Sequence, residues 1–168
     1  PRQLVDDGRY HVIARTNRSE YTLKSDAVKQ LFVLVLEQAK TKYRFRLETF
    51  CIMDNHVHLM LVIPSGESLS GLMQWILSVF AMRFNRMHEL KGHVWYDRFK
   101  STIVATRDYY MTLVDYILTN PVKAGMVKRI IDYPWTALHW WRKPRQGLVE
   151  PPDREVRQRY RKLLRKRR

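Results

Sequence analysis

The sequence is short of cysteine, of long apolar runs and of acidic residues, and each shortage excludes a class of protein. Its one cysteine, Cys51, rules out an intramolecular disulfide and fits a reducing compartment. No apolar run reaches the ~18 residues that a membrane-spanning helix needs, and the first residues lack the apolar stretch of a secretory signal. We therefore expect a cytoplasmic protein with no membrane partner.

Basic residues outnumber acidic ones by 31 to 16, which gives a formal net charge of +15 in 168 residues. Hydrophobic residues make up 45% of the chain, enough for a globular core, and aromatic residues make up 12%. Basic charge together with aromatic side chains favours nucleic acid, where counterion release supplies affinity and rings stack on bases. An anionic membrane surface is the alternative, but the charge is not confined to one amphipathic helix.

Two histidines stand in a predicted strand that runs from Cys51 to Ile63. Side chains alternate along a strand, so His56 and His58 point to the same side, about 7 Å apart. Neutral imidazole is the commonest protein ligand of metal ions, so the pair favours a metal site, with two ordinary core histidines as the alternative. The opposite side of the strand is uniformly apolar and must be buried; it carries Val57, Leu59, Leu61 and Ile63.

The periodicity of apolar residues predicts the order β-α-β-β-α-β, followed by one more helix. The expected elements are a strand over 9–17, a helix over 25–40, a strand over 44–52, the histidine strand, a helix from Ser68 or Ser70 to Leu90, a strand over 98–106 and a helix over 108–120, which Pro121 should end. This order predicts an α+β, ferredoxin-like split βαβ sandwich, whose antiparallel sheet has two helices on one face and the last helix at the other. We expect one domain over residues 1–150 and a basic C-terminal helix or tail over 151–168.

Within the last predicted helix, Tyr116 and Asn120 are four residues apart and therefore share one face. If this helix crosses the open face of the sheet, it brings a hydroxyl and an amide oxygen to the two imidazoles. Such a set can bind a divalent ion, and the neutral oxygen suits Mg²⁺ or Mn²⁺ better than zinc. Tyr109 and Tyr110 are rival tyrosines, but neither has a ligand-capable residue one turn later. The remaining histidines are expected to be packing or surface residues: His11, His88, His93 and His139.

Four motifs together point to a known family. They are M-D-N-H-V-H-L-M over 53–60, G-H-V-W-Y-D-R-F-K-S over 92–101, Y-I-L-T-N-P-V-K-A-G over 116–125 and Y-P-W over 133–135. With them the sequence resembles the REP-associated tyrosine transposases, a branch of the single-tyrosine HUH transposases. The resemblance spans residues 9–138, and the block that starts at Tyr116 is its most distinctive part.

This resemblance implies a metal-dependent enzyme that cleaves and joins single-stranded DNA at repetitive extragenic palindromes, beside a hairpin and a short guide tetranucleotide. Matched position by position, Tyr116 would be the nucleophile that forms a 5′-phosphotyrosine, and His56, His58 and Asn120 would bind Mg²⁺ or Mn²⁺. Related insertion-sequence transposases have Gln, a longer residue, at the position of Asn120. A bacterial, nucleoid-associated location follows from such a substrate.

Several basic and polar side chains are candidate contacts to DNA, with a solvated surface as the alternative for those outside the C-terminal segment. They are Arg15, Asn17 and Arg18, expected to read the guide, then Arg98 and Lys100, and in the C-terminal segment Arg154, Arg157 and Arg161. Two other functions stay open: a non-catalytic protein that binds hairpins, and an insertion-sequence transposase that works as a dimer. The sequence shows no obvious dimer seam, so a monomer is expected.

Overall fold

An antiparallel four-stranded sheet forms the middle of the fold, in the order β2-β3-β1-β4. The computed structural model describes residues 7–142 and 147–164. The strands are β1 (Gly8–Arg15), β2 (Arg46–Ile52), β3 (His56–Ile63) and β4 (Lys100–Ile103). Along the β1–β3 pair, Arg15 lies opposite His56 and Ile13 lies opposite His58. The strand order confirms the ferredoxin-like sandwich, although β4 is shorter than the strand predicted over 98–106.

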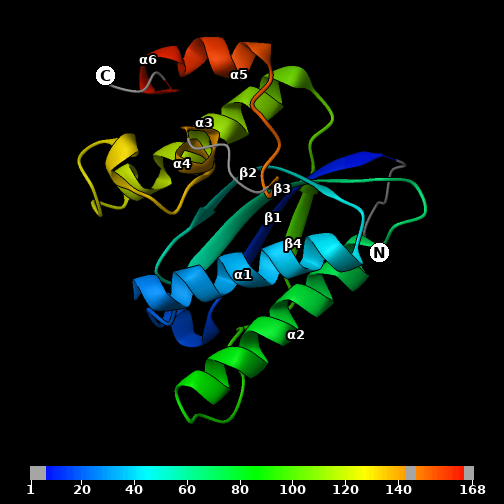
Figure 1. Ribbon diagram of the computed structural model, residues 1–168, viewed down its shortest axis with the longest axis vertical. Coiled ribbons are helices and arrows are strands. Elements are labelled where there is room, and N and C mark those ends of the chain that lie inside the picture. Colours follow the sequence, from blue (N-terminus) through cyan, green and yellow to red (C-terminus); the bar gives the residue numbers. More distant parts are fainter. Residues whose placement is uncertain (1–6, 143–146, 165–168) are drawn as a thin grey trace.

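Helices α1 (Asp26–Lys42) and α2 (Leu69–Met87) cover one face of the sheet, as Figure 1 shows. Ser25 and Ser68 begin them, because each hydroxyl accepts a backbone N–H three residues further on. Between the two helices the rings of Phe32, Phe80 and Trp95 pack edge-on or tilted, with centroids 5.3 to 6.2 Å apart. The apolar side of β3 lies against this layer and is buried, as its sequence predicts.

Helix α3 (Arg107–Lys123) lies on the other face of the sheet (Figure 1). The prediction that Pro121 ends this helix is wrong, because α3 continues to Lys123. A proline so close to the end removes only one backbone donor from the last turn. The N–H of Ala124 still bonds to the carbonyl of Asn120, and the Pro121 ring is buried. Packing therefore outweighs the lost hydrogen bond.

After α3 the chain packs beside β2 and then returns over α3. The short helices η2 (Ile130–Asp132) and α4 (Ala137–Arg142) come first, and the N–H of Ile52 bonds to the carbonyl of Trp135. Then α5 (Arg154–Arg159) and α6 (Arg161–Leu164) follow, with Arg159 and Tyr160 both bonded to the Asp115 carboxylate of α3. The basic segment is thus two short helices docked on α3, and residues 165–168 of its prediction lie outside the described residues. No helix within residues 7–142 and 147–164 has the length and apolar character to cross a bilayer.

The turn that leads into β3 is fixed by a buried ion pair. The Lys29 ammonium group of α1 lies 2.7 Å from a carboxylate oxygen of Asp54, and the Lys29 side chain is only 3% exposed. The carbonyl of Asn55 accepts hydrogen bonds from both the N–H and the hydroxyl of Thr16, at 2.9 and 3.0 Å. These bonds hold the backbone in place immediately before His56.

An Asp54→Ala substitution should therefore destabilise the fold by about 3 kcal/mol, because it leaves the Lys29 charge buried without a counter-charge. Urea unfolding followed by circular dichroism measures the free energy of unfolding. The matched Asp54→Asn variant keeps a hydrogen-bond acceptor and should lose less. Equal stability of the wild type and the alanine variant would show that the pair does not hold the turn.

Candidate active site

The two histidines of the predicted motif lie at the start of β3, on the sheet face that α3 covers. Their ring centroids are 4.8 Å apart and their planes meet at 79°. His58 is fully buried and His56 is half-buried. Strand alternation thus places the two imidazoles side by side, as the sequence predicts.

Tyr116 and Asn120 of α3 face these imidazoles. The Tyr116 ring is perpendicular to the His58 ring, with centroids 5.4 Å apart. The amide nitrogen Nδ2 of Asn120 lies 3.2 Å from Nε2 of His58. Tyr116 is 39% exposed, so a large substrate can reach it from solvent. The structure therefore brings together the four residues that the motifs indicate.

A third histidine, His11 of β1, joins this cluster, although its sequence context predicts only a packing or surface residue. Its Nε2 atom lies 3.0 Å from Nδ1 of His58, and the two rings stack with centroids 5.2 Å apart. The edge of the Tyr116 ring is also near, at 6.3 Å between centroids. Alternation along β1 puts His11 and Arg15 on one side of the strand. Only the pairing of Ile13 with His58, however, places His11 diagonally beside the motif.

All three imidazoles are neutral at neutral pH. Burial lowers the pKa of His58 to about 2, assisted by the nearby His56, His11 and Arg15. Burial lowers the pKa of His56 to about 4, and the positive charge of Arg15 acts in the same direction. Burial alone lowers the pKa of His11 to about 4. A neutral imidazole keeps a free lone pair, which metal binding requires.

Hydrogen bonds decide which ring nitrogen of each ligand candidate carries the proton. Nδ1 of His56 lies 2.7 Å from the amide oxygen of Asn55, which can only accept, so His56 is protonated at Nδ1. The Asn120 amide, in the orientation found, donates to Nε2 of His58, so His58 is also protonated at Nδ1 and donates to His11. Both Nε2 atoms of the motif therefore carry lone pairs.

Two such lone pairs are of the kind that could hold a divalent metal ion, and the Asn120 amide could offer a third donor. A half-turn of that amide would end its hydrogen bond to Nε2 of His58 and put its oxygen where its nitrogen now lies, so that a metal ion could bind both atoms. Within residues 7–142 and 147–164 there is no group of three or more His, Cys, Asp or Glu residues that could hold a metal. A metal site around His56 and His58 therefore depends on the amide oxygen of Asn120, the type of ligand that Mg²⁺ and Mn²⁺ prefer.

Two cations border the cluster. The Lys123 ammonium group lies 5.5 Å from the centroid of the Tyr116 ring, two turns along α3. Arg15 is exposed and lies directly across the strand pair from His56. A phosphate that approaches Tyr116 therefore meets positive charge from both α3 and β1.

The predicted DNA contacts fall into separate groups. The first group, Arg15, Asn17 and Arg18, borders the site. Arg15 is the last residue of β1 and lies opposite His56, and the short helix η1 (Asn17–Ser19) follows it. A second group, Arg98 and Lys100, is exposed at the start of β4. The last group is exposed on α5 and α6, on the side of α3 away from the sheet (Figure 1), and consists of Arg154, Arg157 and Arg161. The structure does not bring this last group to the histidines.

The sequence matches known proteins over much of this fold. Residues 4–120 match the family model described as "Transposase IS200 like". A REP-associated tyrosine transposase of Escherichia coli K12 is 28% identical over 95 residues, which are 56% of this chain and 55% of that protein. A Haemophilus influenzae protein provisionally given the same name is 24% identical over 113 residues, 61% of this chain and 64% of that protein. The chain thus spans less than two thirds of each of these curated relatives.

The fold also matches solved structures. A REP-associated tyrosine transposase bound to a REP hairpin superposes with a TM-score of 0.73 at 24% identity, over 91% of this chain and 88% of that one. At this identity the match shows a shared fold. The family match covers more than half of the chain and includes His56, His58, Tyr116 and Asn120. On that evidence the chain belongs to the IS200-like transposase family.

Proposed function

We propose that this protein nicks and rejoins single-stranded DNA at hairpin-forming palindromes, with Tyr116 as the nucleophile. One observation carries the proposal. An accessible tyrosine ring stands perpendicular to His58, whose Nε2 lone pair faces the Asn120 amide, and the Nδ1 contact of His56 to Asn55 leaves the Nε2 lone pair of His56 for a metal ion. A partly exposed phenol beside the fully buried, neutral imidazole of His58 is an unfavourable arrangement for packing alone, and it suits attack on a phosphodiester.

In the proposed step the Tyr116 hydroxyl oxygen attacks the phosphorus of the scissile phosphodiester. A bond forms between phosphorus and the tyrosine oxygen while the bond from phosphorus to the 3′ oxygen breaks. The hydroxyl proton leaves Tyr116 and the departing 3′ oxygen takes up a proton, so the products are a 5′-phosphotyrosine and a free 3′-hydroxyl. Since the phosphodiester is exchanged and not hydrolysed, the reverse reaction can join a new strand without ATP.

His56, His58 and Asn120 are the proposed ligands of Mg²⁺ or Mn²⁺. When bound, such an ion would supply Lewis-acid polarisation of the phosphate. The chain's own residues orient the site. Asn55 accepts the Nδ1 proton of His56, and His11 accepts the Nδ1 proton of His58, so both rings are held in place.

The net charge of the protein and the ligand of a structural neighbour support the proposed substrate. The formal net charge is +15, and one structural neighbour is described as bound to a REP hairpin. Arg15, Asn17 and Arg18 lie at the His56 end of β1, where we propose that they contact the unpaired guide beside the hairpin. We further propose that the protein acts as a monomer, and in the bacterial cytoplasm, where its DNA is.

The test is a denaturing gel of protein, Mn²⁺ and labelled hairpin single strands taken from repeats of the source genome. A band at the combined mass of protein and DNA, absent with EDTA, is expected. Cleavage without such a band would make water the nucleophile and remove Tyr116 from its role. Binding with neither product would favour the non-catalytic hairpin-binding protein, and light scattering under the same conditions separates a monomer from a dimeric transposase.

His11 gives a prediction specific to this site. A His11→Phe variant removes the acceptor that holds the Nδ1 proton of His58, so Mn²⁺ affinity should fall by roughly 10- to 100-fold. Electron paramagnetic resonance of free Mn²⁺ measures that affinity without any DNA. A His11→Gln variant restores an acceptor and should recover part of the loss, while His93→Phe, at an exposed position, should bind as the wild type does. Unchanged affinity in His11→Phe would remove His11 from the site.

A further inference from the structure

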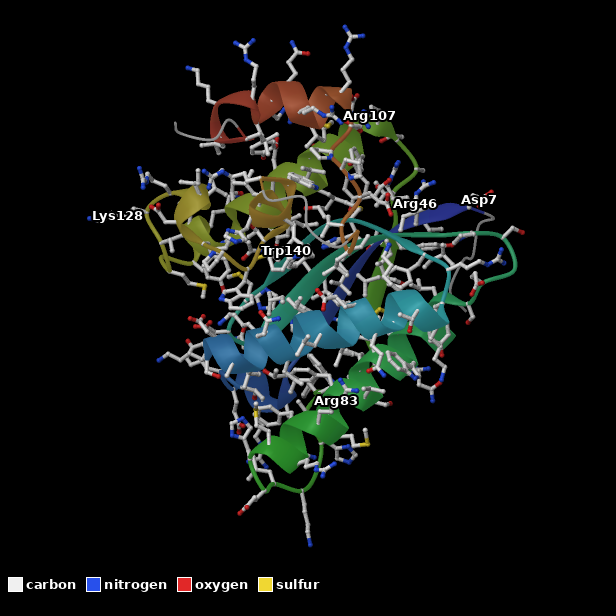
Figure 2. The ribbon with its side chains drawn as sticks, in the orientation of Figure 1. Asp7, Arg46, Arg83, Arg107, Lys128 and Trp140 are labelled. Atoms are coloured by element: carbon white, nitrogen blue, oxygen red, sulfur yellow. The ribbon has the colours of Figure 1, made fainter. Side chains whose placement is uncertain are left out.

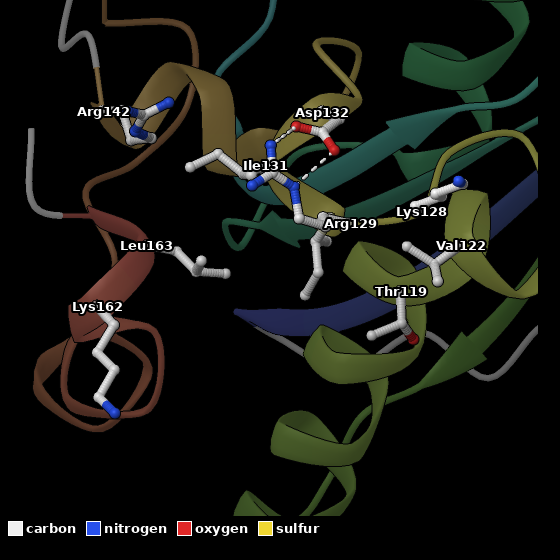
Figure 3. Close-up of a pocket in the computed structure, with 10 residues that line it drawn as sticks. Thr119, Val122, Lys128, Arg129, Ile131, Asp132, Arg142, Lys162 and Leu163 are labelled. Carbon is white, nitrogen blue, oxygen red and sulfur yellow. Dashed lines mark hydrogen bonds and ion pairs between the residues drawn. The ribbon is translucent and has the colours of Figure 1, made fainter. Parts of the chain in front are cut away.

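A hollow of about 560 Å³ lies beside α3, away from the histidines, and no step of the proposed reaction uses it (Figure 3). Four segments form its walls. Thr119 and Val122 come from α3, Ile131 from the 128–132 segment that contains η2, Arg142 from α4, and Leu163 from α6. Tyr116 and Asn120 point to the sheet, whereas Thr119 and Val122 lie on a neighbouring flank of the same helix.

The basic residues that line this hollow outnumber the acidic ones. Its lining contains four basic residues and one acidic residue, Asp132. Both carboxylate oxygens of Asp132 bond to the guanidinium group of Arg129, at 2.6 and 2.8 Å (Figure 3). The other three cations, Lys128, Arg142 and Lys162, have no ion pair within residues 7–142 and 147–164. Three cations around one hollow favour an anion.

Arg142 adds a separate observation. Its Nε atom is buried and has no hydrogen-bond partner among the described residues. Buried N–H groups in folded proteins are nearly always paired, so this donor lacks an acceptor that a ligand could provide. A guanidinium group binds phosphate oxygens through parallel hydrogen bonds, which makes phosphate the acceptor of choice.

The size and the walls of the hollow select a particular kind of anion. The volume is far larger than a bare phosphate needs, and Val122, Ile131 and Leu163 contribute apolar wall. In Figure 3 Lys128, Arg142 and Lys162 lie on different sides of these apolar side chains. A nucleotide unit has this distribution, because its anionic phosphates flank a largely apolar sugar and base.

We propose that the hollow is a second nucleic-acid site, which holds a nucleotide of the bound DNA strand by its phosphates while another phosphate lies at Tyr116. The inference rests on the proposed function, because it assigns the anion to the same DNA. Lys128 and Arg142 are the main contacts, and Lys162 brings the docked C-terminal segment to the same strand.

The test uses Lys128→Gln/Arg142→Gln in a Tyr116→Phe background, where the DNA is bound but not cut. Fluorescence anisotropy of a labelled hairpin single strand is measured over a range of salt concentrations. Each lost phosphate contact lowers the slope of log affinity against log salt, so the double variant should lose roughly one to two units of slope. Its melting temperature should stay unchanged, because neither residue has an ion pair to lose within residues 7–142 and 147–164.

The matched control removes the same charge elsewhere. Arg86 lies in the last turn of α2 and Lys91 follows that helix, both exposed and on the far side of the sheet from the hollow. Figure 2 shows the same separation between Lys128 and Arg83 of α2. Arg86→Gln/Lys91→Gln should keep the wild-type slope. If the slope fell equally in both double variants, the loss would come from long-range electrostatics alone, and the proposed site would be overturned.

A rescue experiment tests the position itself. Cys51 is buried, so a thiol introduced by Lys128→Cys can be modified selectively. An aminoethyl methanethiosulfonate reagent adds back a positive charge and should restore the slope, whereas the neutral methyl reagent should not. If both reagents give the same slope, charge at residue 128 does not contact DNA.

The remaining outcomes separate this inference from the proposed function. If wild-type protein binds the hairpin and the slope of the Lys128→Gln/Arg142→Gln variant equals that of the wild type, the second site is wrong and the proposed function stands. If radiolabelled inorganic phosphate binds the wild type, fails to bind that variant, and the DNA slope is unchanged, the hollow takes a free anion and the DNA assignment is overturned. If no hairpin binds the wild type, both proposals fall together.

Discussion

A Tyr116→Phe variant is expected to form no covalent adduct with hairpin DNA and to cleave it at least roughly 10³-fold more slowly than the wild type. The substitution removes one oxygen atom, which is the proposed nucleophile, and leaves the ring that faces His58 in place. The fold and the metal site should therefore be unaffected. Single-turnover cleavage at saturating Mn²⁺, resolved on a denaturing gel, measures the loss.

Tyr109→Phe is the matched control. Tyr109 is exposed on the same helix, at 38%, close to Tyr116 at 39%, but it lies near the start of α3, far along the helix from Asn120. This variant should cleave as the wild type does. Hairpin affinity of Tyr116→Phe should also match the wild type, which separates loss of chemistry from loss of binding. A Tyr116→Phe protein that still forms the adduct would transfer the nucleophile to another residue.

The second large effect is expected at the metal ligands. His56→Ala should weaken Mn²⁺ binding by at least about 100-fold, more than the His11 variant, because it removes a ligand and not a neighbour of a ligand. His56 is only half-buried, so its loss should cost less fold stability than the loss of the fully buried His58. Isothermal titration of Mn²⁺ into the protein measures the affinity, and cleavage should fall with it.

His88→Ala serves as the comparison, since His88 is exposed at the end of α2 and its ring contacts Phe84, on the other side of the sheet. Its Mn²⁺ affinity should equal that of the wild type. The loss in His56→Ala should also be partly overcome by a large excess of Mn²⁺ in the cleavage assay. If His56→Ala binds Mn²⁺ normally, the ion is held elsewhere and the proposed ligand set is wrong.

Much of the candidate site could be predicted, because the spacing of residues within one strand or one helix decides which side chains share a face. Alternation along β3 puts His56 and His58 on one side whatever the strand packs against. The four-residue spacing of Tyr116 and Asn120 does the same for α3. The caps at Ser25 and Ser68 depend only on a hydroxyl that precedes a helical segment.

Other features depended on how distant segments pack. His11 stands next to His58 only because β1 and β3 pair in one register, and a shift by one residue would turn His11 away. Helix α3 runs through Pro121 because that ring is buried, which a local rule about proline does not include. The hollow near Arg142 joins residues from α3, the 128–132 segment, α4 and α6.

The sequence by itself therefore determined the element order, the two histidines on one strand face, and the tyrosine and asparagine on one helix face. These follow from backbone periods of two and about 3.6 residues, which act within a few neighbouring positions. The tertiary structure alone decided that His11 bonds to His58, that the C-terminal helices dock on Asp115, and that three cations without an ion pair among the described residues meet at one hollow. The first two contacts join residues that are 47 and 45 positions apart, and only the packing of the whole sheet and its helices sets such distances.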